Sequence, residues 1–171
     1  MPVVLYPKDL YHSDDSVERA VYGPGVTVRV RHVPTIADLA PEDCADVDGL
    51  MTLGDWIHAA DLPKFPRLRV VVRMGVGYDR VDRAACAARG ITVCNVPDYG
   101  TMEVAEHAVV TAIALRRGLF LYHDTQRANP PAPWGFMPHP IIRRSEVQTF
   151  GIIGMGRIGT CLLYTSPSPR D

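Results

Sequence analysis

The strongest β-strand signal in the chain runs directly into a glycine loop, in the order Leu68-Arg69-Val70-Val71-Val72-Arg73 and then Met74-Gly75-Val76-Gly77-Tyr78-Asp79. β-branched residues dominate the first half, and two glycines leave the backbone of the second half uncovered. An alanine-rich segment over 81–89 predicts a helix that ends at Gly90. The next run, Ile91-Thr92-Val93-Cys94-Asn95, predicts another strand. This order of strand, helix and strand indicates a parallel sheet.

The same alternation extends back to the N-terminus. Strands are predicted over 3–6, 26–30 and, more weakly, 49–52. Asp14 and Asp15 can cap a short helix over 16–22, which stops at Gly23. The sequence therefore predicts an α/β fold built on a parallel sheet.

A long helix is predicted over 101–117, with Thr101 as its N-cap and two arginines in its last turn. Between His107 and Arg116 only Thr111 is polar, so the helix is apolar on nearly every side. Such a helix must be covered on most faces, which indicates a domain or subunit interface.

A short helix, a proline-rich loop and a strand are predicted after this helix. A short helix is predicted over 119–127, and prolines crowd the loop over 129–140, where we expect Trp134 and Phe136 to act as anchors. A last strand is predicted over 149–153, and it opens into a second glycine loop.

This second loop reads Gly154-Met155-Gly156-Arg157-Ile158-Gly159 and has the G-x-G-x-x-G pattern of dinucleotide-binding proteins. Gly154 permits a tight turn, Gly156 lets the backbone approach a pyrophosphate, and Gly159 allows close packing of helix on strand. The phosphates would lie on the free N–H groups of the helix that starts near Arg157. A methyltransferase-type glycine loop and a merely tight turn remain alternatives. The acidic residue that would hold the ribose falls about 20 residues further on, beyond the part that we treat as native.

The first loop, around Val76 and Gly77, also follows a strand, at the edge of the sheet where open α/β folds bind ligands. Successive exposed backbone N–H groups can hold a carboxylate without any cationic side chain. The alternative is a strand-to-helix turn that needs glycine for its backbone angles.

The composition is that of a globular protein. The chain has 171 residues, of which 47% are hydrophobic and 22% charged, and its formal charge is −1. With no net positive field we expect no nucleic-acid partner, and without an apolar run of about 18–20 residues we expect no membrane partner. The first residues lack the features of a signal peptide, so we expect a cytoplasmic protein.

Neither the cysteines nor the histidines form a metal-binding pattern. The four cysteines stand singly, without the spacing of a zinc site or the density of a disulfide scaffold. The six histidines form no metal-binding pair around a carboxylate. We therefore predict no metal site and buried, reduced thiols.

The last segment, 161–171, reads Cys161-Leu162-Leu163-Tyr164-Thr165-Ser166-Pro167-Ser168-Pro169-Arg170-Asp171. Its prolines and its lack of an amphipathic period predict that it does not continue the helix expected after Gly159. The string also resembles the translation of a sequencing adapter. We expect 161–171 to be a non-native tail that follows a truncation after the glycine motif, and a natural Pro/Ser tail is the alternative.

Three blocks at 73–82, 90–108 and 150–159 together resemble the NAD-dependent D-2-hydroxyacid dehydrogenases. The resemblance covers essentially residues 1–160. The block Asn95-Val96-Pro97-Asp98-Tyr99-Gly100-Thr101 is most similar to the branch that contains the C-terminal binding proteins, which are corepressors, and their bacterial dehydrogenase relatives.

The resemblance implies a flavodoxin-like substrate domain over 1–97 and the N-terminal part of an NAD-binding Rossmann domain over 98–160. The helix from Thr101 then matches one that the family uses between domains and in dimers, so a homodimer is implied for the full-length parent.

The resemblance also implies site residues. Val76 and Gly77 match positions whose backbone binds the substrate carboxylate, and Val76 also touches the cofactor. Gly154, Met155, Gly156, Arg157, Ile158 and Gly159 match the cofactor loop, with Arg157 and Ile158 on the pyrophosphate. The family's catalytic Arg, Glu and His come after the glycine motif, so no catalytic residue is expected in this chain.

The implied reaction of the parent is reversible hydride transfer between the C2 carbon of a 2-hydroxy acid and the nicotinamide of NAD. The chain itself, without catalytic residues, is expected to be inactive. One alternative is a binding module in which NAD(H) occupancy controls assembly with protein partners. Another is a fragment without any function of its own.

Overall fold

The computed structural model describes residues 1–8, 14–128, 130–131 and 133–165. The chain divides into two compact units, Met1–Tyr99 and Gly100–Asp171. Each unit is coherent in itself, so the two are described in turn.

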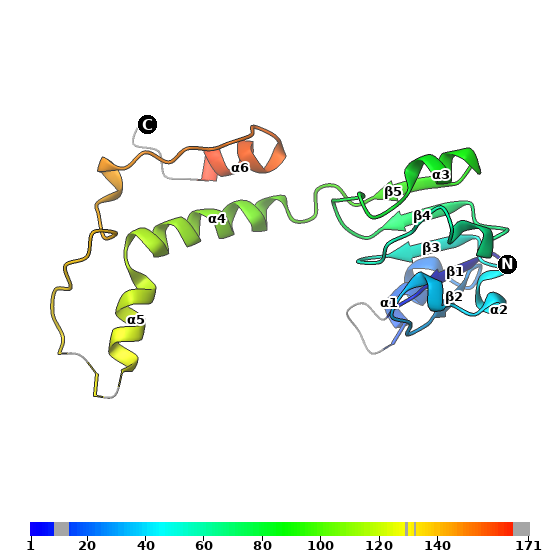
Figure 1. Cartoon of the computed structure of the whole chain (residues 1–171), viewed down its shortest axis with the longest axis horizontal. Coiled ribbons are helices and arrows are strands. Elements are labelled where there is room, and N and C mark those ends of the chain that lie inside the picture. The colour runs from blue at the N-terminus through cyan, green and yellow to red at the C-terminus, as the bar shows by residue number, and fades with distance from the viewer. Residues whose placement is uncertain (9–13, 129, 132, 166–171) are drawn as a thin grey trace. The chain divides into compact units, whose positions relative to one another are not determined.

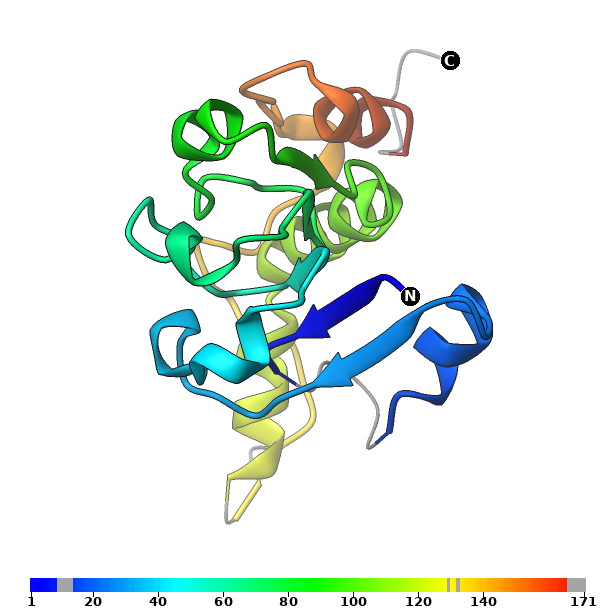
Figure 2. The same ribbon diagram turned by 90° about the vertical axis from the view of Figure 1, so that its right-hand side faces the viewer.

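The first unit is built on a five-stranded sheet in the order β2-β1-β3-β4-β5, and every neighbouring pair of strands is parallel. Figure 1 labels these strands, and Figure 2 shows β1 and β2 side by side in dark and lighter blue. The strands are β1 (Val3–Tyr6), β2 (Thr27–Val30), β3 (Gly49–Thr52), β4 (Val70–Arg73) and β5 (Thr92–Asn95). The predicted α/β fold with a parallel sheet is confirmed.

Short helices connect the strands of this unit. They are α1 (Ser16–Tyr22), η1 (Ile36–Asp38), α2 (Pro41–Cys44), η2 (Leu62–Lys64) and α3 (Arg83–Ala88). Helix α3 begins where the Asp82 carboxylate accepts a hydrogen bond from the N–H of Ala85 at 2.9 Å, and Gly90 follows it with a φ of 71°. Glycine adopts this left-handed conformation without the strain that a Cβ would cause.

The core of the first unit lies on one face of the sheet. Alternate residues of the strands point to this face, as the two-residue period of a strand requires. Leu5, Leu50 and Val71 are fully buried there, and Phe65, Cys44 and Cys86 belong to the same cluster. Burial raises the pKa of both thiols, so they remain protonated, as expected for small buried cysteines.

All the regular secondary structure in the described part of the second unit is helical. It contains α4 (Thr101–Arg116), α5 (Leu119–Arg127), η3 (Ser145–Val147) and α6 (Arg157–Thr165). In α4 only two residues, Ala105 and Ala114, are buried, while Val110 and Ile113 remain exposed. The apolar surface that the sequence predicted for this helix is therefore left largely uncovered within the described residues.

Three expectations for the second unit are wrong. The predicted strand over 149–153 does not form, because a strand requires a paired neighbour and none of the described residues of this unit provides one. Gly100, not Thr101, is the N-cap of α4, since Thr101 already has helical geometry. Trp134 and Phe136 do not anchor their loop, because their side chains are 97% and 85% exposed.

The expectation that 161–171 does not continue the helix after Gly159 is wrong for its first five residues. Helix α6 continues through Thr165, and Leu162 is buried, with only 8% of its surface exposed. No proline lies between the start of α6 at Arg157 and Pro167, so proline does not end the helix earlier. Residues 166–171 lie outside the described residues.

No helix in the described part of the chain has the length and apolar character needed to cross a membrane.

Candidate functional site

All five strands of the first unit run in the same direction, so their carboxyl ends meet along one edge of the sheet. Open α/β sheets bind ligands at this edge. The segment that follows β4 there is the first glycine loop, with Val76 and Gly77 at its centre. The structure thus places both predicted substrate-binding residues where this kind of fold holds ligands.

The carbonyl groups of this loop are tied to the end of β5. The Gly75 carbonyl accepts a hydrogen bond from the N–H of Val96 at 3.1 Å. The Val76 carbonyl accepts one from the side-chain amide Nδ2 of Asn95 at 2.8 Å. Two successive peptide groups are therefore held from one side.

The N–H groups of the same two peptides are left free. In a planar trans peptide the N–H points opposite to the C=O of the same unit. The N–H groups of Val76 and Gly77 therefore point away from Val96 and Asn95, which hold the carbonyls of these two units. Within the part of the chain that the structure describes, neither N–H donates a hydrogen bond. Val76 is 45% exposed, so the loop is open to solvent. Adjacent unpaired N–H groups of this kind can hold a carboxylate.

The glycines of this loop are not needed for unusual backbone angles. Neither Gly75 nor Gly77 has a positive φ. A Cβ placed on Gly77 would meet only the Asp79 carboxylate oxygens, at 3.7 and 3.8 Å, which is ordinary van der Waals contact. The small size of Gly77 therefore leaves open space beside the free N–H groups, which is what a bound ligand requires.

A buried polar group supports the loop from the neighbouring strand. The Met74 N–H donates to the Thr52 carbonyl at 2.7 Å, at the end of β3. The Thr52 hydroxyl donates to Asp55 at 3.1 Å, and the other Asp55 oxygen lies 2.7 Å from the Lys8 ammonium. Sequence reasoning missed this cluster, since nothing in the spacing of Lys8 and Asp55 marks them as partners.

Aromatic rings and arginines surround the same edge. The Arg83 guanidinium lies over the Tyr78 ring at 4.6 Å, and that of Arg80 lies over Trp56 at 5.6 Å. At the end of β1, the Tyr6 hydroxyl lies 3.0 Å from that of Tyr22. Burial raises the pKa of Tyr6, and the contact with Tyr22 adds to the effect, so this hydroxyl remains neutral.

The second glycine loop belongs to the second unit and leads into α6. Gly154 has a φ of 96°, which only glycine adopts readily. A Cβ on Gly159 would overlap the Gly154 carbonyl, whereas a Cβ on Gly156 would meet nothing within 4 Å. Gly154 thus makes a tight turn, Gly156 leaves its approach open, and Gly159 contacts the Gly154 carbonyl closely, although the strand on which the motif predicts Gly159 to pack does not form.

The start of α6 offers hydrogen-bond donors next to this open approach. Its first turn closes with a hydrogen bond from the Thr160 N–H to the Gly156 carbonyl at 2.9 Å. The N–H groups of Arg157, Ile158 and Gly159 precede that bond, so among the described residues the helix itself gives them no acceptor. Together with Gly156 they form an arrangement that fits a pyrophosphate.

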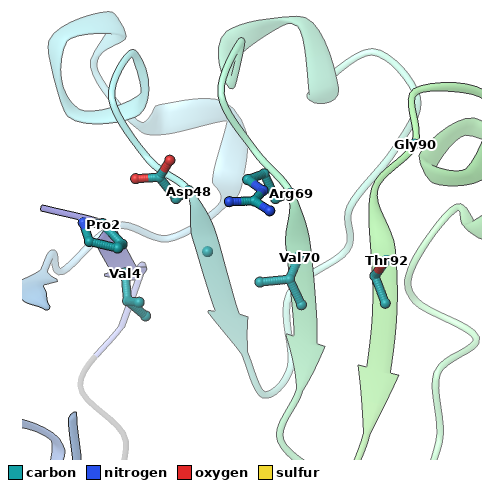
Figure 3. A pocket seen from close by; sticks show the side chains of 8 residues that line it. Pro2, Val4, Asp48, Arg69, Val70, Gly90 and Thr92 are labelled. Carbon is teal, nitrogen blue, oxygen red and sulfur yellow. The ribbon is translucent and has the colours of Figure 1, made fainter.

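A surface hollow of about 520 Å³ lies at the opposite edge of the sheet, where the strands begin. Val4, Gly49, Val70 and Thr92 stand in register across four strands and form its floor, and Asp48 and Arg69 flank it (Figure 3). A Cβ on Gly49 would touch both valines at 3.4 Å, so glycine deepens the hollow. The hollow is separate from the edge that carries Val76 and Gly77.

Metal binding finds no support in the described residues. No three His, Cys, Asp or Glu side chains among them come close enough together to hold a metal ion. None of the four cysteines forms a disulfide bond. Cys44 and Cys86 are buried as expected, whereas Cys94 is exposed and Cys161 is only partly buried, so the expectation of buried thiols is wrong for these two.

Comparison with known proteins identifies the family of the chain. The sequence model of the family described as "D-isomer specific 2-hydroxyacid dehydrogenase, catalytic domain" matches residues 8–127. The chain is 37% identical to a glyoxylate reductase of Thermococcus gammatolerans over 122 residues, which are 69% of this chain and 36% of the relative. It is 33% identical to a D-3-phosphoglycerate dehydrogenase of Mycobacterium leprae over 165 residues, which are 93% of this chain and 29% of the relative. The chain thus spans about a third of the length of these relatives.

Solved structures extend the similarity to the fold. The NADPH-dependent glyoxylate/hydroxypyruvate reductase from Sinorhizobium meliloti, in complex with NADP and malonate, matches with a TM-score of 0.74 and 29% identity. This match covers 95% of the present chain and 49% of that chain. Because the family model spans more than half of the sequence and the fold agrees, the chain belongs to the D-isomer specific 2-hydroxyacid dehydrogenase family.

Proposed function

We propose that this chain contains the carboxylate-binding part of an NAD-linked oxidoreductase that interconverts 2-hydroxy acids and 2-oxo acids. The observation that carries the proposal is the pair of free N–H groups of Val76 and Gly77 at the carboxyl edge of the sheet. A 2-oxo acid such as glyoxylate has a carboxylate that can accept from both. Two charge-assisted hydrogen bonds would then fix the acid while its C2 carbon remains accessible.

NAD is the cofactor that we propose for the second glycine loop. Gly154, Gly156 and Gly159 shape the turn, and the N–H groups of Arg157 and Ile158 would receive the pyrophosphate. Met155 and Ile158 are more than 40% exposed beside this loop, so their side chains can contact a bound dinucleotide. When bound, the nicotinamide accepts or supplies the hydride, and Val76 would contact it from the substrate side.

The domain assignment and the tail remain proposals. We propose that 1–97 form the substrate domain, that 98–160 begin the nucleotide-binding domain and that 161–171 are not native. The greater length of the relatives supports a longer parent protein that carries the catalytic groups. We also propose a cytoplasmic location for it, where cysteines without disulfide bonds are usual.

The apolar surface of α4 supports a homodimer of that longer protein. Val104, Val110 and Ile113 are exposed on more than one side of the helix, and a soluble monomer rarely leaves such a surface uncovered. Contact with another domain of the same subunit is the alternative. The NAD(H)-sensing corepressor alternative rests on the similarity of 95–101 to the C-terminal binding protein branch, and no observation favours it over the dehydrogenase.

Nitrogen-15 NMR titrations of the chain test the proposed function. Glyoxylate should shift the amide signals of Val76 and Gly77, and NAD should shift those of Gly156, Arg157 and Ile158. Acetamide, which has the size of a small acid but no charge, serves as the control. Shifts confined to other residues, or equal shifts with acetamide, would refute the assignment of these loops.

A further inference from the structure

We propose that Asn95 is a positioning residue for the carboxylate loop: its side-chain amide sets the direction in which the Gly77 N–H points. The proposal rests on the proposed function of that loop and assigns a task to a residue outside it. Asn95 is the last residue of β5, and its partner, the Val76 carbonyl, lies 19 positions earlier in the chain.

The geometry of one peptide group gives the reason. The Val76 carbonyl and the Gly77 N–H belong to the same planar unit, so rotation of that unit moves both groups together. With the carbonyl held at 2.8 Å from Asn95 Nδ2, the N–H is directed away from β5. Without that bond, the unit joins the exposed Val76 to a glycine, and glycine restricts rotation about the flanking bonds less than any other residue would.

The neighbouring peptide does not need a side chain for the same purpose. The Gly75 carbonyl is held by the backbone N–H of Val96, which any residue at 96 other than proline supplies. Among the described residues no backbone N–H donates to the Val76 carbonyl, and the side-chain amide of Asn95 donates to it instead. An aspartate of the same shape has no N–H to donate and would place a negative charge against the carbonyl and close to the bound acid.

The position of Asn95 in the sheet suits this positioning role. Strand β5 is at the edge of the sheet, and Asn95 pairs with Arg73, the last residue of β4. The register therefore fixes the Asn95 backbone beside the start of the glycine loop. Because Asn95 lies at the strand end and is partly exposed, its replacement should leave the core cluster unchanged.

The variants Asn95→Ala and Asn95→Asp test the proposal in the 171-residue chain, with Thr92→Ala at the other end of β5 as the matched control. Oxalate is the probe, and amide shifts of Val76 and Gly77 report its binding. We expect both Asn95 variants to weaken oxalate binding by about fivefold to tenfold, the equivalent of one hydrogen bond, with the larger loss for the aspartate. Thr92→Ala should bind as the wild type does, and all variants should keep the wild-type melting temperature within a few degrees.

Backbone relaxation provides a readout that does not depend on the ligand. In Asn95→Ala the heteronuclear NOE of Gly77 should fall, whereas that of Ile91 should not change. An unchanged Gly77 signal would overturn the proposal even if oxalate binds. If the wild type fails to bind oxalate at Val76 and Gly77, the proposed function of the loop fails, and the relaxation data still decide whether Asn95 orders it.

Discussion

Replacement of Gly77 by valine should weaken carboxylate binding strongly without harm to the fold. A Cβ at this position meets only the Asp79 carboxylate, at 3.7 Å or more, and the backbone φ is not positive. Neither steric overlap nor backbone strain is therefore introduced. Exposed substitutions of this kind change the free energy of unfolding by about 0.5 kcal/mol or less.

The loss of binding follows from what the new side chain covers. The two γ-methyl groups of valine would occupy the open space beside the Gly77 N–H, so a carboxylate could reach at most the Val76 N–H. One hydrogen bond to a charged group contributes about 1.5–3 kcal/mol. At about 1.4 kcal/mol for each factor of ten, the dissociation constant should rise by about 10-fold to 100-fold.

Isothermal titration with oxalate, together with thermal unfolding, measures both effects. Gly25→Val is the matched control, because a Cβ there meets nothing within 4 Å and Gly25 lies in a different loop of the same unit. Oxalate binding that is equal in the Gly77 and Gly25 variants would refute the role of the loop. A large drop in melting temperature for Gly77→Val alone would show that glycine is needed for structure.

Four further outcomes are expected. Purified chain should not reduce glyoxylate, pyruvate or hydroxypyruvate with NADH, and measurable turnover in a spectrophotometric assay would contradict its assignment as a non-catalytic part. Gly159→Ala should destabilise the second unit, because its Cβ would overlap the Gly154 carbonyl, and circular dichroism should show a loss of helix. The hydrogen bond from Arg29 lowers the pKa of Asp46. This pair therefore stabilises the fold above about pH 4, and the stabilisation is lost as the pH falls through the lowered pKa. The stability of Asp46→Asn should depend less on pH in that range, as acid unfolding would measure. In the longer protein that we propose, Ala108→Glu in α4 should convert a dimer to a monomer in light scattering, and an unchanged mass would leave only an interdomain role for that helix.

Most of the first unit could be predicted from the sequence, because β-branched runs and glycine stops mark its elements locally. The helix over 16–22 and the strand over 49–52 have the expected bounds. The strand over 149–153 could not be judged in this way, since its formation depends on partners and not on its own residues. The anchoring role of Trp134 failed for the same reason, because an apolar residue is buried only where a neighbouring surface covers it.

The candidate site shows a similar limit. The glycine spacing predicted both loops, and the motif explained why Gly154 needs a positive φ. The contact between Asn95 and the Val76 carbonyl depends on the pairing of β4 with β5, which no local pattern encodes. The cluster of Lys8, Thr52 and Asp55 likewise joins residues from two strand ends that only the folded sheet brings together.

A crystal structure of the chain grown with oxalate and NAD would test the central claim most directly. We predict that one oxalate carboxylate lies within hydrogen-bond distance of the N–H groups of Val76 and Gly77. The pyrophosphate should lie at the start of α6, on Arg157 and Ile158. Oxalate bound elsewhere, with the Val76 and Gly77 N–H groups facing only solvent, would contradict the account.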